Sequence, residues 1–128
     1  IDIKNRESWR PFSPSSLDGS FVQEGWSRAD EASPFMTVAL TGTECSDHLK
    51  GVRHTDRTSR LQIVKESENP RFAKILEQLG QVLGAPVVLN TSLNARDEPI
   101  ACRPIEAIRT FSTTPLDALI IGNSLLTK

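Results

Sequence analysis

The chain has few of the residues that form disulfides or bind metals, with two cysteines, two histidines and no tyrosine among 128 residues. Cys45 and Cys102 lie 57 positions apart without a CxxC pair, and His48 and His54 belong to no HExxH motif. This pattern favours two reduced thiols over a disulfide scaffold or a structural zinc site. We therefore expect no metal site within this chain, and a cytoplasmic location.

Long apolar runs and an excess of one charge are also missing. The longest apolar candidate, residues 118–121, has the length of a strand and cannot cross a bilayer. Fifteen basic and sixteen acidic residues give a net charge of −1, so we expect neither a membrane nor a nucleic-acid partner. The chain begins with Ile1 and has no signal-peptide pattern, and we interpret it as a fragment of a longer protein. Its length and its 38% hydrophobic residues suit one globular domain.

The first half of the chain predicts loops and short strands. Prolines and other turn formers are frequent in residues 1–34, where we expect loops and short edge strands with little helix. Residues 35–40 (FMTVAL) predict a strand. In residues 59–64 (SRLQIV) apolar and polar side chains alternate, which is the pattern of a half-buried strand.

The second half begins with a strong helix signal. Asn69 can cap this helix, Pro70 fits its first turn and Gly84 can terminate it. The apolar residues at helical spacing should face a core, and they are Phe72, Ile75, Leu76, Leu79, Val82 and Leu83. A uniformly apolar strand is predicted to follow at residues 86–89.

A second helix is predicted over residues 104–113, with Ile105, Ile108 and Phe111 facing inward, and another buried strand over residues 118–121. The order strand, helix, strand, helix, strand is typical of the α/β class, and right-handed crossovers would make its three strands parallel. We therefore predict an α/β fold with helices packed on the sheet and at least three parallel strands in the second half.

Polar side chains follow the apolar strand, at the edge where open α/β sheets bind their ligands. They belong to Asn90, Thr91, Ser92 and Asn94. Ser92 and Asn94 can point the same way, because side chains two positions apart share a face of an extended segment. Such a pair could bind a phosphate or a ribose hydroxyl. The alternative, which composition alone favours, is a turn stabilised by Asn and Ser side chains.

Lys4 and Arg6 have the same two-residue spacing. Together they could neutralise a triphosphate, Lys4 as a point charge and Arg6 as a planar fork, or they could lie on a charged surface strand. Trp9 follows, and it could stack on a base or pack in the core, packing being the simpler role. The chain contains neither GxxxxGK[ST] nor GxGxxG, so cationic and hydroxyl side chains would have to bind any ATP.

Further polar residues could form an anion site. Residues 53–60 (RHTDRTSR) contain three arginines, and His54 could donate a hydrogen bond to phosphate. Arg60 lies at the start of the predicted half-buried strand, where a cation without a partner is costly. Glu98 could hold a metal–phosphate complex or position an arginine such as Arg96. The alternatives are an exposed loop with local ion pairs and a plain salt bridge.

In order along the chain, these segments resemble the C-terminal domain of the O-carbamoyltransferases, the family of nodulation protein U and of antibiotic-tailoring enzymes. Residues 4–15 (KNRESWRPFSPS) are similar to KxRExWRPFAPS, and residues 53–62 (RHTDRTSRLQ) to HVDGTARVQ. Residues 86–100 (PVVLNTSLNARDEPI) are similar to PVLLNTSFNxRGEPI, and residues 116–119 (LDAL) to LDALVLG. The resemblance extends from end to end, so residues 1–128 would be one such domain.

The resemblance implies a YrdC-like fold, a mixed twisted sheet in which a KxR element works with an SxN element. The implied catalytic residues are Lys4, Arg6, Ser92 and Asn94. The implied substrate-binding residues are His54, Thr58, Arg60, Asn90, Thr91, Arg96 and Glu98.

The implied activity is the formation of carbamoyl-adenylate from carbamoyl phosphate and ATP, with Mg²⁺ on the phosphates. The carbamoyl group would then pass to a hydroxyl of a small-molecule acceptor. That step belongs to a separate N-terminal domain with an iron-type metal, whose ligands are not in this sequence.

Three positions depart from the family's motifs, since Arg57 and Asp97 replace glycines and Leu93 replaces phenylalanine. Arg57 would cost a tight turn or add a cation, and Asp97 would place a negative charge beside the phosphate site. Two other functions stay open. One is a nucleotide-binding module without turnover, and the other is a threonylcarbamoyl protein acting on transfer RNA, which a net charge of −1 does not favour.

Overall fold

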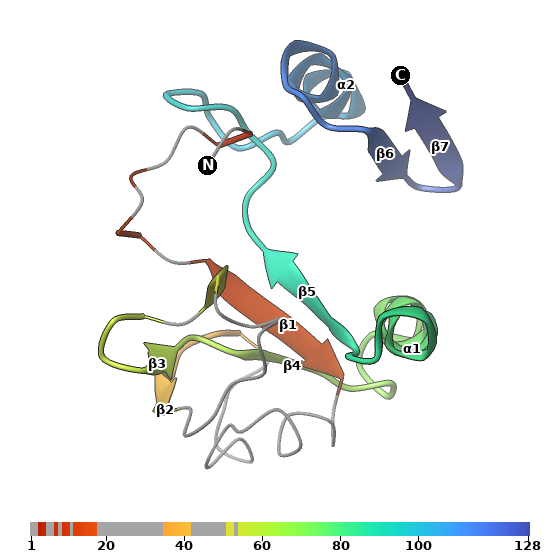
Figure 1. Cartoon of the computed structure of the whole chain (residues 1–128). Coiled ribbons are helices and arrows are strands. Elements are labelled where there is room, and N and C mark those ends of the chain that lie inside the picture. The colour runs from red at the N-terminus through yellow and green to blue at the C-terminus, as the bar shows by residue number, and fades with distance from the viewer. Residues whose placement is uncertain are drawn as a thin grey trace. The chain divides into compact units, whose positions relative to one another are not determined.

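The computed structural model of the chain describes residues 3–4, 7, 9–10, 12–17, 35–41, 51–52 and 54–128. The chain divides into two compact units, one of Pro11–Thr91 and the other of Ile1–Arg10 together with Ser92–Lys128. Figure 1 labels the helices and strands of both, and each unit is described by itself.

A three-stranded sheet organises the Pro11–Thr91 unit. Its central strand β1 (Ser13–Leu17) lies between β4 (Gln62–Val64) and β5 (Val87–Asn90) (Figure 1). β4 runs parallel to β1, whereas β5 runs antiparallel to it. The prediction of an α/β fold is confirmed. The prediction that the strands before and after the long helix run parallel is wrong, because β1 inserts between them and pairs in opposite senses with the two.

β1 occupies the centre of the sheet, although the turn formers around it predicted an edge strand. Pro14 has no N–H to donate, but it pairs only with Leu89 of β5 and lies before residues 15–17, which pair with β4. Ser15 is fully buried, and its hydroxyl donates to Oε1 of Gln62 at 2.6 Å. Polar residues can therefore form this central strand because the buried hydroxyl has a partner.

The strands predicted over residues 35–40 and 59–64 are shorter than expected. Of the first, only the end forms a strand, as β2 (Leu40–Thr41), which pairs with β3 (Thr58–Ser59). Before it, Met36 has φ = +61°, a left-handed conformation that no regular strand contains. The second predicted strand is divided into β3 and β4.

The alternation of residues 59–64 is nevertheless confirmed. Leu61 and Ile63 are buried in one core with Leu40 and Val52, while Arg60 is exposed. The expected burial cost of the Arg60 cation is therefore absent, because its side chain lies on the solvent side of this segment.

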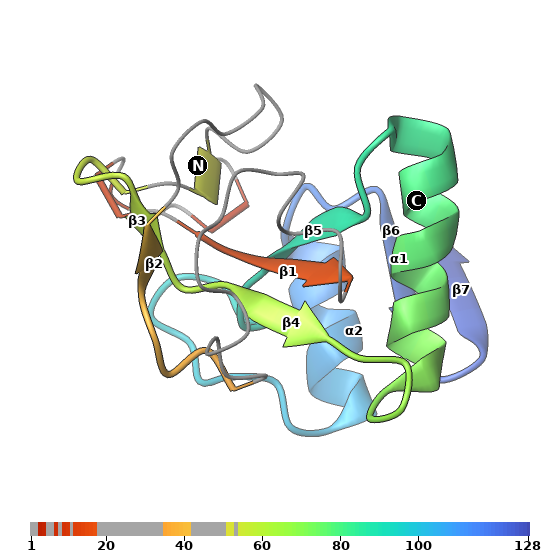
Figure 2. The ribbon, with the colours of Figure 1, turned by 90° about the horizontal axis from the view of Figure 1, so that it is seen from below.

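Helix α1 (Pro70–Leu83) begins and ends as predicted. The Asn69 side chain accepts the backbone N–H of Phe72 at 3.2 Å, which caps the first turn. Gly84 ends the helix with φ = +79°, and its N–H donates to the carbonyl of Gly80 at 2.9 Å. The helix packs against β1 and β5 of the sheet (Figure 2).

The packed face of α1 is narrower than predicted. Ala73 and Leu76 are buried against the sheet. Ile75, Val82 and Leu83, which were predicted to face the core, are 50%, 80% and 59% exposed. The apolar stripe covers more of the helix surface than a sheet of three short strands can bury.

The unit of Ile1–Arg10 and Ser92–Lys128 consists of α2 (Pro104–Thr113) and a hairpin of β6 (Ala118–Ile121) and β7 (Ser124–Thr127). Helix α2 is confirmed at its predicted bounds. Within the described residues β6 pairs only with β7, in an antiparallel sense, and not with a parallel neighbour as predicted. The sequence patterns did not predict β7.

The core of this unit lies between the helix and the hairpin. Ala107, Phe111 and Leu119 are buried there, and Leu126 of β7 packs against them. Ile105, predicted to face inward, is 64% exposed, because the hairpin covers a different side of α2. Among the described residues no helix has the length and hydropathy that a membrane span requires.

Candidate functional site

Lys4 lies at the centre of the candidate site, in the unit that also contains Ser92 and Asn94. Its Nζ is 2.6 Å from the carbonyl oxygen of Ser92, 2.8 Å from that of Asn94 and 2.7 Å from Asn94 Oδ1. Ser92 Oγ is 3.4 Å away. An ammonium has three N–H groups and no acceptor, so these oxygens can accept all of its protons. The structure therefore brings Lys4, Ser92 and Asn94 together.

The loop that holds Lys4 uses its own donors to fix these oxygens. Ser92 Oγ donates to Asn94 Oδ1 at 2.6 Å. Asn94 Nδ2 donates to the carbonyls of Ala95 and Glu98 at 3.1 and 2.9 Å. The side-chain donors of Ser92 and Asn94 are thus engaged within the loop, which presents oxygens to the lysine. In this arrangement Ser92 and Asn94 position the Lys4 ammonium. A phosphate that entered the site would contact this ammonium, because the side-chain donors of Ser92 and Asn94 are already engaged.

Asp97 closes the loop with φ = +62°. The related motif has glycine at this position, and a left-handed backbone explains that preference because glycine lacks the Cβ that makes the conformation unfavourable. The Asp97 carboxylate is 91% exposed and lies 3.6 Å from Nε of Arg96. The substitution therefore keeps the turn and adds a charge that Arg96 balances.

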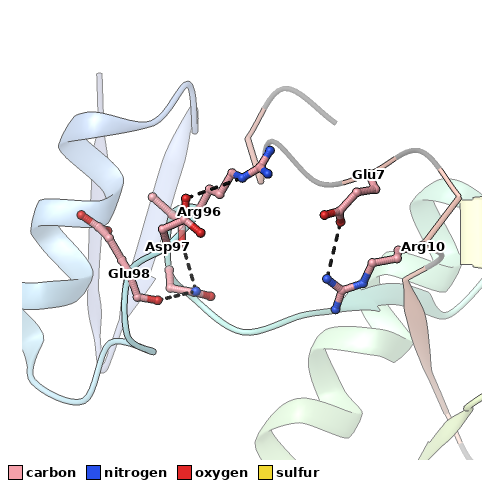
Figure 3. A network of polar contacts seen from close by, with 7 residues as sticks. Glu7, Arg10, Arg96, Asp97 and Glu98 are labelled. Atoms are coloured by element: carbon pink, nitrogen blue, oxygen red, sulfur yellow. Dashed lines mark hydrogen bonds and ion pairs between the residues drawn. The ribbon is translucent and has the colours of Figure 1, made fainter.

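Figure 3 shows two of the ion pairs in the unit that contains Lys4. Nη1 of Arg10 lies 3.5 Å from Oε2 of Glu7, and the second pair joins Arg96 to Asp97. The pKa of Glu7 is lowered, mainly by a hydrogen bond from its own backbone N–H and further by the charges of Arg10 and Arg96. The field of Arg96 therefore reaches the N-terminal segment.

Sequence reasoning missed Glu7 and Arg10, although an ExxR spacing is a known signal for a pair within one turn. Trp9 is 75% exposed, so the simpler expectation of core packing is wrong for its side chain. Arg6, the second cation of the predicted KxR element, lies outside the described residues.

The remaining predicted site residues belong to the Pro11–Thr91 unit, where some of them have structural partners. Asn90 Nδ2 donates to Gln62 Oε1 at 2.7 Å and to Met36 Sδ at 3.3 Å. Thr91 directly follows β5 and is exposed. Arg60 is exposed as well. The structure thus gives Asn90 a role within its own sheet.

A tight turn contains His54 and Thr58. The His54 N–H donates to the Thr58 carbonyl at 2.8 Å, and Arg57 closes the turn with φ = +65°. Asp56 Oδ1 accepts the side-chain hydroxyl of Thr58 at 2.7 Å and its backbone N–H at 2.9 Å. These two bonds, the hydroxyl first, lower the pKa of Asp56. The turn that a glycine would favour is therefore retained with arginine.

The described residues contain no group of three His, Cys, Asp or Glu side chains that could hold a metal by themselves. Mg²⁺ on a nucleotide needs less, namely one or two carboxylates in addition to phosphate oxygens and water. Asp97 and Glu98 supply two carboxylates in the loop whose oxygens hold Lys4. The donor set therefore fits a metal brought in with phosphates better than a metal bound by the protein alone.

The sequence model of the family described as Carbamoyltransferase C-terminus matches residues 1–128. Nodulation protein NolNO of Sinorhizobium fredii is 37% identical over 130 residues, which cover 98% of this chain and 19% of that protein. Nodulation protein NolO of Bradyrhizobium diazoefficiens is 36% identical over 129 residues, covering 98% and 23%. The 3'-hydroxymethylcephem-O-carbamoyltransferase of Amycolatopsis lactamdurans is 28% identical over 127 residues, covering 96% and 23%. The chain spans about a fifth to a quarter of the length of these relatives.

Proposed function

Because this chain belongs to the Carbamoyltransferase C-terminus family, and so to proteins of carbamoyl transfer, we propose that it is the ATP-handling part of an O-carbamoyltransferase. It has the YrdC-like fold and acts in the cytoplasm. Its substrates are ATP, with Mg²⁺, and carbamoyl phosphate, and its product is carbamoyl-adenylate. A hydroxyl group of a small molecule then receives the carbamoyl group.

The reaction proceeds in balanced steps. Water first cleaves carbamoyl phosphate to carbamate and phosphate. A carbamate oxygen then attacks the α-phosphorus of ATP, the bond from that phosphorus to the oxygen bridging it to the β-phosphate breaks, and pyrophosphate leaves with the electron pair. Finally the acceptor hydroxyl attacks the carbamoyl carbon, loses its proton, and AMP leaves. The adenylation step mainly requires that negative charge on the phosphate oxygens be stabilised in the transition state. Cations of the protein therefore supply most of the catalysis.

The observation that carries this proposal is the Lys4 ammonium held by the oxygens of Ser92 and Asn94. A cation fixed before the substrate binds can stabilise developing charge without reorganising. When ATP binds, the ammonium exchanges at least one loop oxygen for a phosphate oxygen, because it has only three N–H groups. Lys4 is then the catalytic residue, and Ser92 and Asn94 are positioning residues that act through it.

Other groups of the same unit complete the nucleotide site. Arg6 provides the second cation, and Arg96 adds positive potential. The exposed ring of Trp9 stacks on the adenine. Glu98 would hold a magnesium ion brought in with the nucleotide, and the ion would neutralise phosphate charge. The substrate-contacting residues of the other unit are His54, Thr58, Arg60, Asn90 and Thr91.

The acceptor and its metal belong to the part of the relatives that this chain does not match. The cephem relative's name states a hydroxymethyl acceptor for that protein, and we propose a hydroxylated small molecule for this one. The iron-type metal that we expect in the transferring domain would supply Lewis acidity there. No residue of this chain is assigned to it.

A calorimetric titration of the chain with ATP and Mg²⁺ tests the role of Lys4. Lys4→Met keeps the length of the side chain and removes the charge, so we expect the Kd for ATP to rise at least about tenfold, as for the loss of a charge-assisted hydrogen bond. Lys74→Met is the matched control, because Lys74 is an exposed lysine of α1 paired with Glu77 at 2.6 Å. Equal affinities of wild type and Lys4→Met would overturn the proposal.

Pyrophosphate release in the presence of ATP and carbamoyl phosphate distinguishes an enzyme from a binding module. Release that disappears in Lys4→Met supports carbamoyl-adenylate formation. ATP binding without release, in the chain and in a longer protein that contains it, favours a module without turnover. Salt-sensitive binding of transfer RNA would favour the threonylcarbamoyl alternative.

A further inference from the structure

A pocket of about 380 Å³ lies in the unit that contains Lys4, between the segment before α2 and the helix itself. Residues 98–101 form one wall, and Glu106, Arg109 and Thr110 of α2 form the other. The carbonyl of Glu98 also accepts the Asn94 side-chain N–H at 2.9 Å, so this wall is continuous with the loop that holds Lys4. Apart from the magnesium assigned to Glu98, the proposed carbamoyl transfer gives no ligand to the residues of this pocket.

Two opposite charges line the pocket without pairing. In the described part of the chain, the Glu98 carboxylate and the Arg109 guanidinium form no ion pair or hydrogen bond with each other or with another side chain. Each side chain can therefore use all of its hydrogen-bonding groups for a ligand group of opposite charge. A molecule that carries both charges could satisfy the two groups at once, with charge-assisted hydrogen bonds at both ends.

The third charge of the pocket is already neutralised. Oε2 of Glu106 accepts the N–H groups of Cys102 and Arg103 at 2.9 and 3.0 Å. Its Oε1 lies 2.9 Å from Nε and 2.8 Å from Nη2 of Arg103. The charges left for a ligand are therefore one negative, from Glu98, and one positive, from Arg109.

Thr110 gives independent support for a ligand. It is 5% exposed, and within the described residues its hydroxyl has no hydrogen-bond partner. The neighbouring hydroxyls do not share this state, because Ser112, Thr113 and Thr114 donate to the helix carbonyls of Ile108, Arg109 and Thr110. Buried hydroxyls nearly always have a hydrogen-bond partner, so the Thr110 hydroxyl is available to a polar group of a ligand in this pocket.

We propose that this pocket binds a small zwitterion, an α-amino acid with an apolar side chain. Its carboxylate accepts from Arg109 and from the Thr110 hydroxyl, and its ammonium donates to Glu98. Its side chain packs on the apolar wall of Pro99, Ile100 and Ala101, where Ile100 is 66% exposed in the free chain. The pocket volume lies in the range of small-molecule sites. Glu98 is also assigned to the magnesium of the proposed ATP site, whereas Arg109 and Thr110 belong to the amino-acid site alone.

An NMR titration of the ¹⁵N-labelled chain with L-leucine tests the proposal. We expect saturable shifts of the amide signals of residues 98–101 and 109–110. Two matched probes each lack one charge: 3-methylbutylamine has no carboxylate, and 4-methylpentanoate has no ammonium. Each should bind at least about tenfold more weakly than L-leucine, as expected for the loss of a charge-assisted contact.

Variants identify the groups that bind. Arg109→Gln and Glu98→Gln should each raise the Kd for L-leucine about tenfold. Thr110→Val should raise it, and Thr110→Ser, which keeps the hydroxyl, should restore it. Arg71→Gln, at an exposed arginine of α1, is the control. Because Arg109 is exposed, its variant keeps the test valid even if Thr110→Val fails to fold.

Three results would overturn the proposal: no saturable shift with L-leucine, equal binding of the two single-charge probes and L-leucine, or unchanged affinity in both charge variants. ATP affinity should be unchanged in Arg109→Gln. The two proposals can therefore fail separately.

Discussion

The ammonium of Lys4 lies 2.7 Å from Oδ1 of Asn94, although 90 positions separate the two residues. Asn94 is engaged on both sides of its amide, since its oxygen accepts from Lys4 and from Ser92 while its nitrogen donates to the carbonyls of Ala95 and Glu98. One side chain thus fixes the N-terminal segment and the conformation of the loop at the same time.

Asn94→Ala should therefore destabilise this unit. The variant leaves two carbonyls and part of the Lys4 ammonium without partners, which should cost about 1–3 kcal/mol in the free energy of unfolding. Urea unfolding of the two proteins measures the difference. Asn123→Ala, at an exposed asparagine of the β6–β7 turn, is the control and should unfold within about 0.5 kcal/mol of wild type. A midpoint for Asn94→Ala equal to that of this control would contradict the structural role.

Replacing Arg57 and Asp97 by glycine should stabilise the protein. Both residues have a positive φ, at +65° and +62°, where a Cβ is unfavourable. Arg57→Gly should raise the free energy of unfolding by up to about 1 kcal/mol. Asp97→Gly should raise it by less, because aspartate tolerates this conformation and because the substitution removes the ion pair with Arg96. Thermal unfolding gives both values. Arg71→Gly, within α1, should instead lower stability by about 1 kcal/mol, and a loss of stability in Arg57→Gly would exclude the strained turn.

Gln62 is a shared acceptor in the centre of the Pro11–Thr91 sheet. Its Oε1 accepts from the buried Ser15 hydroxyl at 2.6 Å and from Asn90 Nδ2 at 2.7 Å. Gln62→Leu should lower the free energy of unfolding by about 1–3 kcal/mol, because the fully buried Ser15 hydroxyl loses its acceptor. Adding Ser15→Ala removes that donor and should recover part of the loss, as a double-mutant cycle would show. Strictly additive effects of the two substitutions would mean that the hydrogen bond contributes nothing.

Local signals in the sequence predicted the helices well. The Asn69 cap, the Gly84 terminus and the bounds of α2 depend on residues only a few positions apart, and all are confirmed. The resemblance to the O-carbamoyltransferases is confirmed by the family match over residues 1–128. That resemblance, and not spacing, indicated that Lys4 would meet Ser92 and Asn94.

Strand order could not be predicted in the same way. β1 becomes central because it pairs with residues about 47 and 74 positions away, and nothing within a short proline-containing segment encodes such partners. The exposure of Val82 and Leu83 has a similar cause, since periodicity shows an apolar stripe but not how wide a surface is available to bury it. The two hydrogen bonds to Gln62 depend equally on tertiary pairing.

The stability of α2 should depend on pH through Glu106. Hydrogen bonds from the backbone N–H groups of Arg103 and Cys102, with the Arg103 side chain, lower the pKa of Glu106 from its usual 4.5 to about 2. A carboxyl whose pKa is lower in the folded state stabilises the fold fully above its unfolded value, and that contribution is lost as the pH falls through the folded value. The urea concentration at the unfolding midpoint should therefore decrease as the pH is lowered from about 4.5 to about 2.

Two variants test this role of Glu106. Glu106→Gln should lower the midpoint at pH 7 and weaken its dependence on pH. Glu68→Gln, which changes an exposed glutamate before α1, should leave the pH profile as in wild type. An identical pH profile for Glu106→Gln and wild type would show that the carboxylate does not cap the helix in solution.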